Sequence, residues 1–113
     1  MSMEYWSDNI MVVELEEGPA FSDDLNAIMD QLEKRTDVDV VISFGSVPYL
    51  NSSNIAQLLR LRKRVVISNR RRMVLCGIDT SVWSLFLVTG LDKVFEFADD
   101  VANGLASVQI PSE

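Results

Sequence analysis

The chain has 113 residues, 48% of them hydrophobic, and we expect a single domain over residues 1–113 with its core at about 10–108. It contains no histidine and one cysteine, which excludes a Ser-His-Asp triad, most zinc sites and an internal disulfide. The formal net charge of −7 is uneven: residues 1–50 carry 11 acidic and 2 basic side chains, a sum of −9, and residues 51–113 carry 6 acidic and 8 basic, a sum of +2.

Three further absences narrow the class of protein. No apolar run approaches the roughly 20 residues that span a bilayer, and the N-terminal residues lack the pattern of a signal peptide. No glycine-rich phosphate or dinucleotide motif is present. We therefore expect a cytoplasmic chain without membrane insertion, catalytic residues, metal or cofactor.

The first half predicts a hairpin, a helix and a buried strand. The elements are strands at Glu4 to Ser7 and Ile10 to Glu16 around an Asp8-Asn9 turn, a helix capped at Ser22-Asp23-Asp24 and ending near Arg35, and a strand from Asp39 to Phe44. Leu25, Ile28, Met29 and Leu32 form the apolar stripe of that helix. The continuous apolar strand that follows is typical of a sheet covered on both faces.

The second half alternates helices and strands. We expect a helix from Ile55 to about Ile67, a strand from Met73 to Ile78, a helix capped at Asp79-Thr80-Ser81 and ended by Gly90, a strand from Val94 to Phe97, and a helix opened by Asp99-Asp100. The expected inward residues of these helices are Ile55, Leu58, Leu59 and Val65 or Val66, then Val82, Leu85, Phe86 and Val88, then Val101, Leu105 and Val108. Cys76, in an apolar strand, is expected in the core. The order predicts an α/β fold with a mixed, mostly parallel sheet and about four helices.

A polar junction, Asn51-Ser52-Ser53-Asn54, lies between the buried strand that ends at Phe44 and the next helix. Functional loops of such sheets lie at the carboxyl ends of strands, and a helix N-terminus stabilises a phosphate. The alternative is that these residues only cap the helix. Before the junction, Leu50 is expected in the core, whereas Tyr49 is either an exposed partner anchor or core packing at the strand end.

Basic residues gather in two clusters, Arg62-Lys63-Arg64 and Arg70-Arg71-Arg72, with Arg60 just before the first. The acidic balance of the whole chain opposes non-specific nucleic-acid binding, which we do not expect. A solvated helix end and a contact surface for an acidic protein remain open for these clusters.

The layout and the junction together resemble the STAS domain, named for sulfate transporters and anti-sigma factor antagonists. Members carry a strand, an aromatic or apolar pair, Asp-Ser-Ser/Thr-Gly and an apolar helix, and Tyr49 to Ile55 occupies those places here. Met73 to Ile78 matches the family's apolar strand, and Phe86 to Leu91 followed by Val94-Phe95 resembles its other recurrent stretch.

The resemblance implies a regulatory protein-binding module of the anti-sigma factor antagonist type. Carried over by position, Ser52 is the phosphoacceptor, and Tyr49, Leu50, Asn51, Ser53 and Asn54 contact the partner. That partner is an anti-sigma factor of the GHKL serine-kinase type, which the phosphorylated protein releases. Two alternatives from the same family are a subunit of a lipid-transport ABC complex and a component of a stressosome-like assembly with other STAS proteins.

Two residues depart from the family motif. Asn51 replaces the Asp, which retains the ability to cap the helix but removes a carboxylate beside the acceptor hydroxyl. Asn54 replaces the Gly and adds a side chain where a kinase approaches. Ser53 is expected to be a structural cap.

Overall fold

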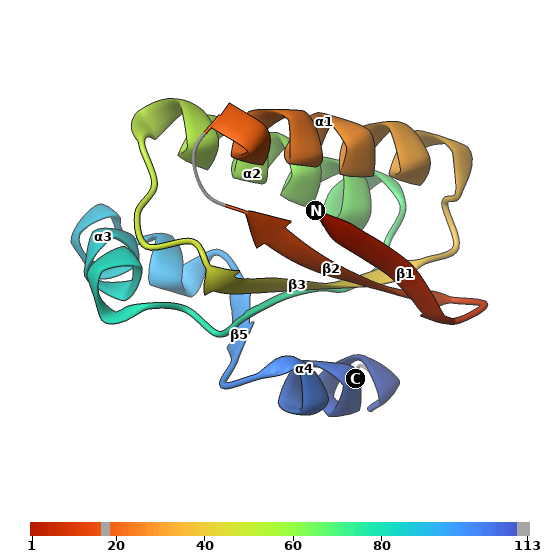
Figure 1. Ribbon diagram of the computed structural model, residues 1–113. Helices are drawn as coiled ribbons and strands as arrows, with labels where there is room; N and C mark the ends of the chain where they lie inside the picture. The colour runs from red at the N-terminus through yellow and green to blue at the C-terminus, as the bar shows by residue number, and fades with distance from the viewer. Residues whose placement is uncertain (17–18, 111–113) are drawn as a thin grey trace.

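The computed structural model describes residues 1–16 and 19–110 (Figure 1). Its strands are β1 (Ser2–Ser7), β2 (Ile10–Glu16), β3 (Asp39–Ser46), β4 (Met73–Cys76) and β5 (Glu96–Ala98). Its helices are α1 (Pro19–Lys34), α2 (Ser52–Arg62), α3 (Thr80–Thr89) and α4 (Val101–Gln109), with a π-helical segment η1 (Lys63–Ser68) after α2 and a 3₁₀ turn η2 (Leu91–Lys93) after α3. The predicted alternation of strands and helices is confirmed. In these two ranges no helix is long and apolar enough to span a bilayer.

The five strands form one mixed sheet in the order β1-β2-β3-β4-β5. β1 runs antiparallel to β2 and every other neighbouring pair is parallel, which confirms the predicted mixed, mostly parallel sheet. Met11 pairs with Val40, and Val40 pairs with Met73, so one row of side chains crosses the three central strands. Because the strand order follows the chain, right-handed crossovers place α1 and α2 on the same face.

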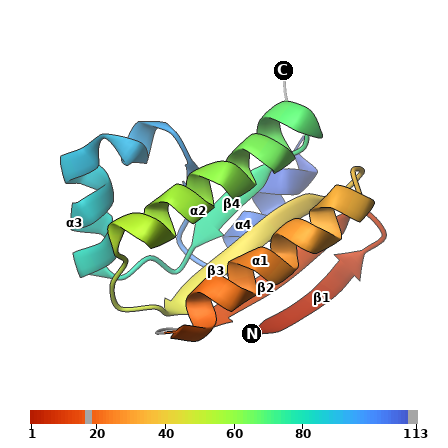
Figure 2. The same cartoon turned by 90° about the horizontal axis from the view of Figure 1, so that it is seen from above.

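The sheet lies between two layers of helix (Figures 1 and 2). α1 and α2 lie side by side over one face, α4 covers part of the other, and α3 lies at the end toward which β3 points. The larger core, on the α1–α2 face, is built around Met11, Leu15, Ile28, Ile42, Phe44, Leu58 and Phe86. The smaller core, under α4, contains Ile10, Val41, Val74, Cys76 and Val108. This arrangement leaves the ends of α2 and α3 that adjoin the β3–α2 loop at the surface.

Local capping explains why several helices begin and end where predicted. Asp79 accepts the backbone N–H of Ser81 at the start of α3, and Gly90, with φ of 75°, ends that helix in the left-handed region. Asp100 accepts the backbone N–H of Asn103 and starts α4.

Several predicted boundaries are displaced. β1 begins at Ser2 rather than Glu4, α2 begins at Ser52 rather than Ile55, and β4 ends at Cys76 rather than Ile78. α1 begins at Pro19, three residues before the predicted cap at Ser22, because proline suits the first helical position. The last strand starts at Glu96 rather than Val94, since the η2 turn takes up the chain after Gly90. The strand predicted from Asp39 to Phe44 continues to Ser46.

The prediction that Leu59 and Val88 face the core is wrong. Leu59 is 38% exposed, and Leu61 is buried in its place, because the inward stripe of α2 and η1 runs through Leu58, Leu61 and Val65. Val88 is 85% exposed. It lies two residues after the buried Phe86, which is about 200° around the helix and so on its outer side.

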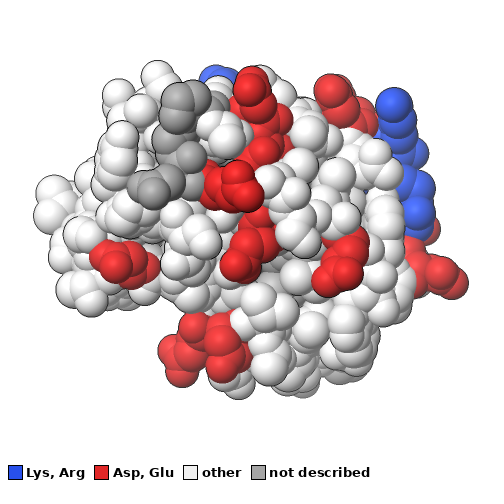
Figure 3. All heavy atoms as spheres, viewed as in Figure 1, with Lys and Arg blue, Asp and Glu red and all other residues white. Residues whose placement is uncertain are grey.

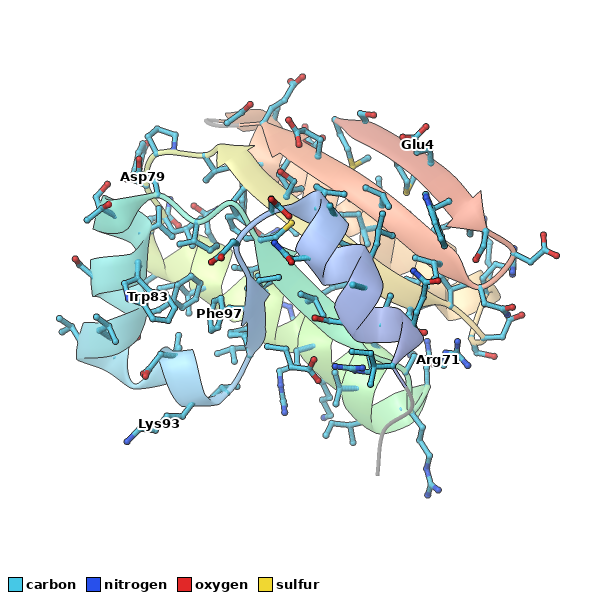
Figure 4. The ribbon with its side chains drawn as sticks, turned by 90° about the horizontal axis from the view of Figure 1, so that it is seen from below. Glu4, Arg71, Asp79, Trp83, Lys93 and Phe97 are labelled. Atoms are coloured by element: carbon cyan, nitrogen blue, oxygen red, sulfur yellow. The ribbon has the colours of Figure 1, made fainter. Side chains whose placement is uncertain are left out.

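Four aromatic residues pack as a cluster at the β5 edge of the sheet: Trp83, Phe86, Phe95 and Phe97. Trp83 meets Phe97 edge to face with ring centroids 4.9 Å apart, and both rings lie beside the β4–β5 edge (Figure 4). Phe86 contacts Phe95 and Phe97 in the same tilted manner. Trp83 is half-buried against this cluster.

Candidate functional site

The loop between β3 and α2 is pinned by two buried residues and presents one exposed ring between them. The N–H of Val47 donates to the carbonyl of Phe44 at 2.9 Å, and Val47 and Leu50 are buried. Tyr49, between them, is 62% exposed. Leu50 therefore lies in the core as predicted, and Tyr49 is exposed rather than packed in the core, whereas its role as a partner anchor stays a prediction.

Asn51 and Asn54 begin helix α2 with a reciprocal cap. The N–H of Asn54 donates to Oδ1 of Asn51 at 2.8 Å, and the N–H of Asn51 donates to Oδ1 of Asn54 at 3.1 Å. Two backbone donors at the helix start are thus satisfied by two neutral side chains. The prediction that Ser53 caps the helix is wrong, because Ser53 is the second residue inside the first turn and Asn51 holds the capping position.

Ser52 is the first helical residue of α2, and it is exposed. Among the described residues its hydroxyl makes no hydrogen bond, whereas the amide oxygens of Asn51 and Asn54 on either side are engaged. The N–H groups of the first turn have no partner within a helix and carry the positive end of its dipole. The first turn of α2 contains no acidic residue. This hydroxyl is therefore free and lies where added negative charge is tolerated.

The start of α3 adjoins this junction. The Ser81 hydroxyl lies within hydrogen-bonding distance of both the Pro48 carbonyl, at 3.1 Å, and the Asp79 carboxylate, at 2.5 Å, and its single proton is donated to one of them at a time. The contact with Pro48 joins α3 to the residue before Tyr49. Asp79 also belongs to this surface and points outward (Figure 4). The hydrogen bonds from the Ser81 hydroxyl and then from its N–H hold the pKa of the Asp79 carboxyl below its usual value. The carboxylate of Asp79 is consequently a fixed negative charge at neutral pH.

An open hollow of about 560 Å³ lies on the α1 side of the junction. It is lined by Phe21, Ser22, Tyr49, Asn51, Ser53, Asn54, Ala56, Gln57 and Arg60. Four of the predicted site residues therefore meet at one hollow, whereas Leu50 lies beneath the surface and Ser52 at the margin. The Nε2 of Gln57 donates to the Ser22 hydroxyl at 2.8 Å and ties α2 to α1 across the hollow.

Gln57 and Ser22 were not among the predicted site residues. Gln57 follows Asn54 by three residues, so helical spacing could have placed it on the same side of α2. Ser22 is 35 residues away in the chain, and no sequence pattern links it to the junction. Its position depends on how α1 packs beside α2.

The two basic clusters have different environments. Arg71 pairs with Asp39 at 3.1 Å, and Arg72 pairs with Glu96 at 2.6 Å, so this cluster holds the starts of β3, β4 and β5 together. Arg72 also donates to the backbone carbonyls of Ser107 and Ile110 at the C-terminal end of α4. In the other cluster Arg62 donates to the carbonyl of Val94 at 2.9 Å, and Lys63 remains exposed. The Arg70–Arg72 cluster is therefore largely structural.

The fold and the junction define a class: an α/β domain that presents a free serine hydroxyl at a helix N-terminus beside an exposed aromatic residue. The family model that matches is the STAS domain, over residues 5–104, and the chain belongs to this family.

Solved structures support the same fold. TM1081 of Thermotoga maritima, named as a proposed anti-sigma factor antagonist, is 13% identical with a TM-score of 0.74, covering 96% of this chain and 94% of that one. A Ser-to-Glu variant of Moorella thermoacetica RsbS is 19% identical with a TM-score of 0.79, covering 96% and 93%. A sulfate transporter family protein from Wolinella succinogenes is 15% identical with a TM-score of 0.77, covering 94% and 89%. At these identities the likeness concerns the fold.

Proposed function

We propose that this chain is a non-catalytic regulatory module of the anti-sigma factor antagonist type. In this proposal the face around Ser52 binds an anti-sigma factor of the GHKL serine-kinase type in the cytoplasm, and phosphorylation of Ser52 ends the interaction. The observation that carries the proposal is the exposed hydroxyl of Ser52, free of hydrogen bonds in the described part of the chain, at the first position of α2. TM1081, the structural neighbour named as a proposed anti-sigma factor antagonist, supports it by its fold.

The position of Ser52 allows a phosphate to change binding without unfolding the domain. A phosphoserine adds about −1.5 to −2 charges at neutral pH. The unpaired N–H groups and the dipole of α2 stabilise that charge by about 0.3–1 kcal/mol. A partner that covers Ser52 must instead strip water from the phosphate, which opposes binding. Phosphorylation of Ser52 would therefore change partner binding and leave the fold intact.

The two asparagines of the cap determine what the chain itself contributes to phosphoryl transfer. Their amide oxygens accept backbone N–H groups and carry no charge, so neither can take the proton of the Ser52 hydroxyl. In the proposal the kinase supplies the base. An Asn51→Asp variant keeps the same acceptor atom for the cap and restores a carboxylate, and we expect faster phosphorylation of Ser52.

Co-purification from native extract tests the proposal. Wild-type and Ser52→Glu baits are compared, with Ala106→Glu on the opposite side of the sheet as a control of equal charge. We expect a kinase-type anti-sigma factor on the wild-type and control baits and its loss from Ser52→Glu, together with phosphorylation of Ser52 when ATP is added. Transport ATPase subunits on all three baits, or a very large STAS assembly, contradict the proposal and point to the ABC-subunit or stressosome-like alternatives.

A further inference from the structure

The outer surface of the α1–α2 layer is divided into two strips of opposite charge. α1 carries exposed Asp23, Asp30 and Glu33, which we call the acidic strip. α2 and the start of η1 carry Arg60, Lys63 and Arg64, which we call the basic strip. The two helices lie side by side and run in the same direction, so the strips are parallel (Figure 2).

A second hollow, of about 450 Å³, runs between the strips. Its lining includes Leu25 and Met29 of α1 and Gln57, Lys63 and Arg64 on the other side. This groove is therefore partly apolar, with charged residues along its walls. Its apolar residues offer area for burial, which the charges alone do not supply.

Most charges of the two strips lack a partner within residues 1–16 and 19–110. Arg64 and Glu33 approach across the groove at 3.7 Å, and this is the single ion pair that joins the strips there. No ion pair or side-chain hydrogen bond in that part of the chain involves Asp23, Asp30, Arg60 or Lys63. Both strips thus present charge that another molecule can complement.

We propose that a second copy of this chain occupies this surface, as a two-fold symmetric dimer. A two-fold axis parallel to the helices, above the groove, places α1 of each copy over α2 of the other. The acidic strip then faces the basic strip twice, once on each side of the axis. A closed dimer needs a patch that complements itself, and parallel strips of opposite sign have this property.

A uniform polyanion fits this surface less well. Nucleic acid or an anionic bilayer would meet the acidic strip as soon as it reached the basic strip, and like charges oppose the contact. The free edge of β1 is also a poor place for self-association. Figure 3 shows acidic side chains spread over the β1–β2 face, so two such faces would repel each other.

The proposed contact is centred away from Ser52, and Gln57 and Arg60 line both the groove and the hollow beside the junction. Lys63 follows Ser52 by eleven residues, which at about 1.5 Å per residue is roughly 16 Å along the helix. The dimer is centred at the C-terminal halves of α1 and α2, and the phosphoacceptor lies at the other end. The inference stands whether or not Ser52 is phosphorylated.

Sedimentation velocity over a range of concentrations and salt tests the dimer. Wild type is compared with Asp30→Lys and Lys63→Glu, and Glu4→Lys on β1 and Lys93→Glu on η2 are controls of equal charge change. We expect a dimer at low salt whose dissociation constant rises about tenfold in each strip variant, and little change in the controls. Circular dichroism verifies that all variants are folded.

The decisive experiment mixes the Asp30→Lys and Lys63→Glu variants. In a heterodimer of Asp30→Lys with Lys63→Glu, every facing pair is again of opposite charge, so we expect the mixture to dimerise nearly as well as wild type. A wild-type monomer at millimolar concentration in low salt overturns the proposal. So does a dimer weakened by Glu4→Lys and unaffected by both strip variants, which would place the contact on β1. A mixture that stays monomeric likewise excludes this geometry.

Discussion

Asn51 and Asn54 cap helix α2 reciprocally, each side-chain oxygen accepting the backbone N–H of the other residue at 3.1 Å or less. These residues occupy the places of the Asp and Gly in the STAS motif. The cap therefore survives both replacements, while the carboxylate beside Ser52 is lost. The stability of the junction therefore does not depend on the carboxylate that the proposed phosphorylation of Ser52 would have beside it in the family motif.

Replacing Asn51 by Ala should destabilise the protein by about 1 kcal/mol, because a capping acceptor for the first turn of α2 is removed. Urea denaturation measures the change in the free energy of unfolding. Ser53→Ala is the matched control, since Ser53 does not cap the helix, and its effect should lie within about 0.5 kcal/mol. Equal losses in the two variants would contradict the assignment of the cap to Asn51.

Replacing Gly104 by Ala should destabilise the protein by about 1–3 kcal/mol. A Cβ at this position would lie 2.8 Å from Cγ1 of Val41, so α4 must move away from the sheet. Val41→Ala alone leaves a cavity, but the double variant should recover part of the loss because the small side chain admits the new methyl group. Thermal melts of the four proteins measure this coupling. Additive losses would show that α4 does not press on Val41.

Cys76 should make stability fall in alkaline solution. Burial, with smaller contributions from Asp100 and Glu14, raises the pKa of its thiol to about 11. Because the folded-state pKa lies above that of the unfolded chain, the unfolded state loses its proton first, and stability declines from about pH 9 upward to about pH 11. The unfolding free energy of wild type and Cys76→Ala, compared over this range, isolates the contribution. Parallel pH profiles would contradict it.

Asp79 should make the stability of the protein fall in acidic solution. Its pKa is lowered by the hydrogen bonds from Ser81, so its contribution is present above the pKa of the unfolded carboxyl and is lost as pH falls through the lower folded value. Asp79→Ala should remove the cap of α3 and lower the free energy of unfolding at neutral pH, and it should flatten the acid limb of the stability profile. Denaturation at neutral and acid pH measures both effects. An unchanged acid limb would show that Asp79 contributes nothing there.

Local signals in the sequence predicted much of the fold. Helix α3 begins at Asp79, whose side chain accepts a backbone N–H, and ends at Gly90, which has a positive φ. Both ends could be predicted, because Asp is a common N-terminal cap and Gly adopts a positive φ readily. The start of α1 was misplaced because Ser22-Asp23-Asp24 has the composition of a cap, while Pro19 suits the first helical turn equally well. Val88 was misplaced because α3 is apolar on several sides, and periodicity alone could not separate its inner side from its outer one.

Part of the candidate site could also be predicted from the sequence, and part depends on tertiary packing. Tyr49, Asn51, Ser52 and Asn54 could be proposed from the sequence because they lie in one short stretch, between a strand and a helix, that resembles the STAS motif. The bond from Gln57 to Ser22 and the groove beyond it depend on two helices packing side by side, and that packing follows from the strand order, which the chain's local patterns do not specify.

The most direct test of the central claim is a calorimetric titration of the co-purified anti-sigma factor with wild-type, Ser52→Glu and Ala106→Glu chains. Ser52→Glu should abolish binding while its unfolding free energy stays within about 1 kcal/mol of wild type, because the charge lies at the helix N-terminus. Ala106→Glu should bind like wild type. Undiminished binding by Ser52→Glu would contradict a phosphorylation switch at Ser52 and leave this serine as part of the first turn of α2.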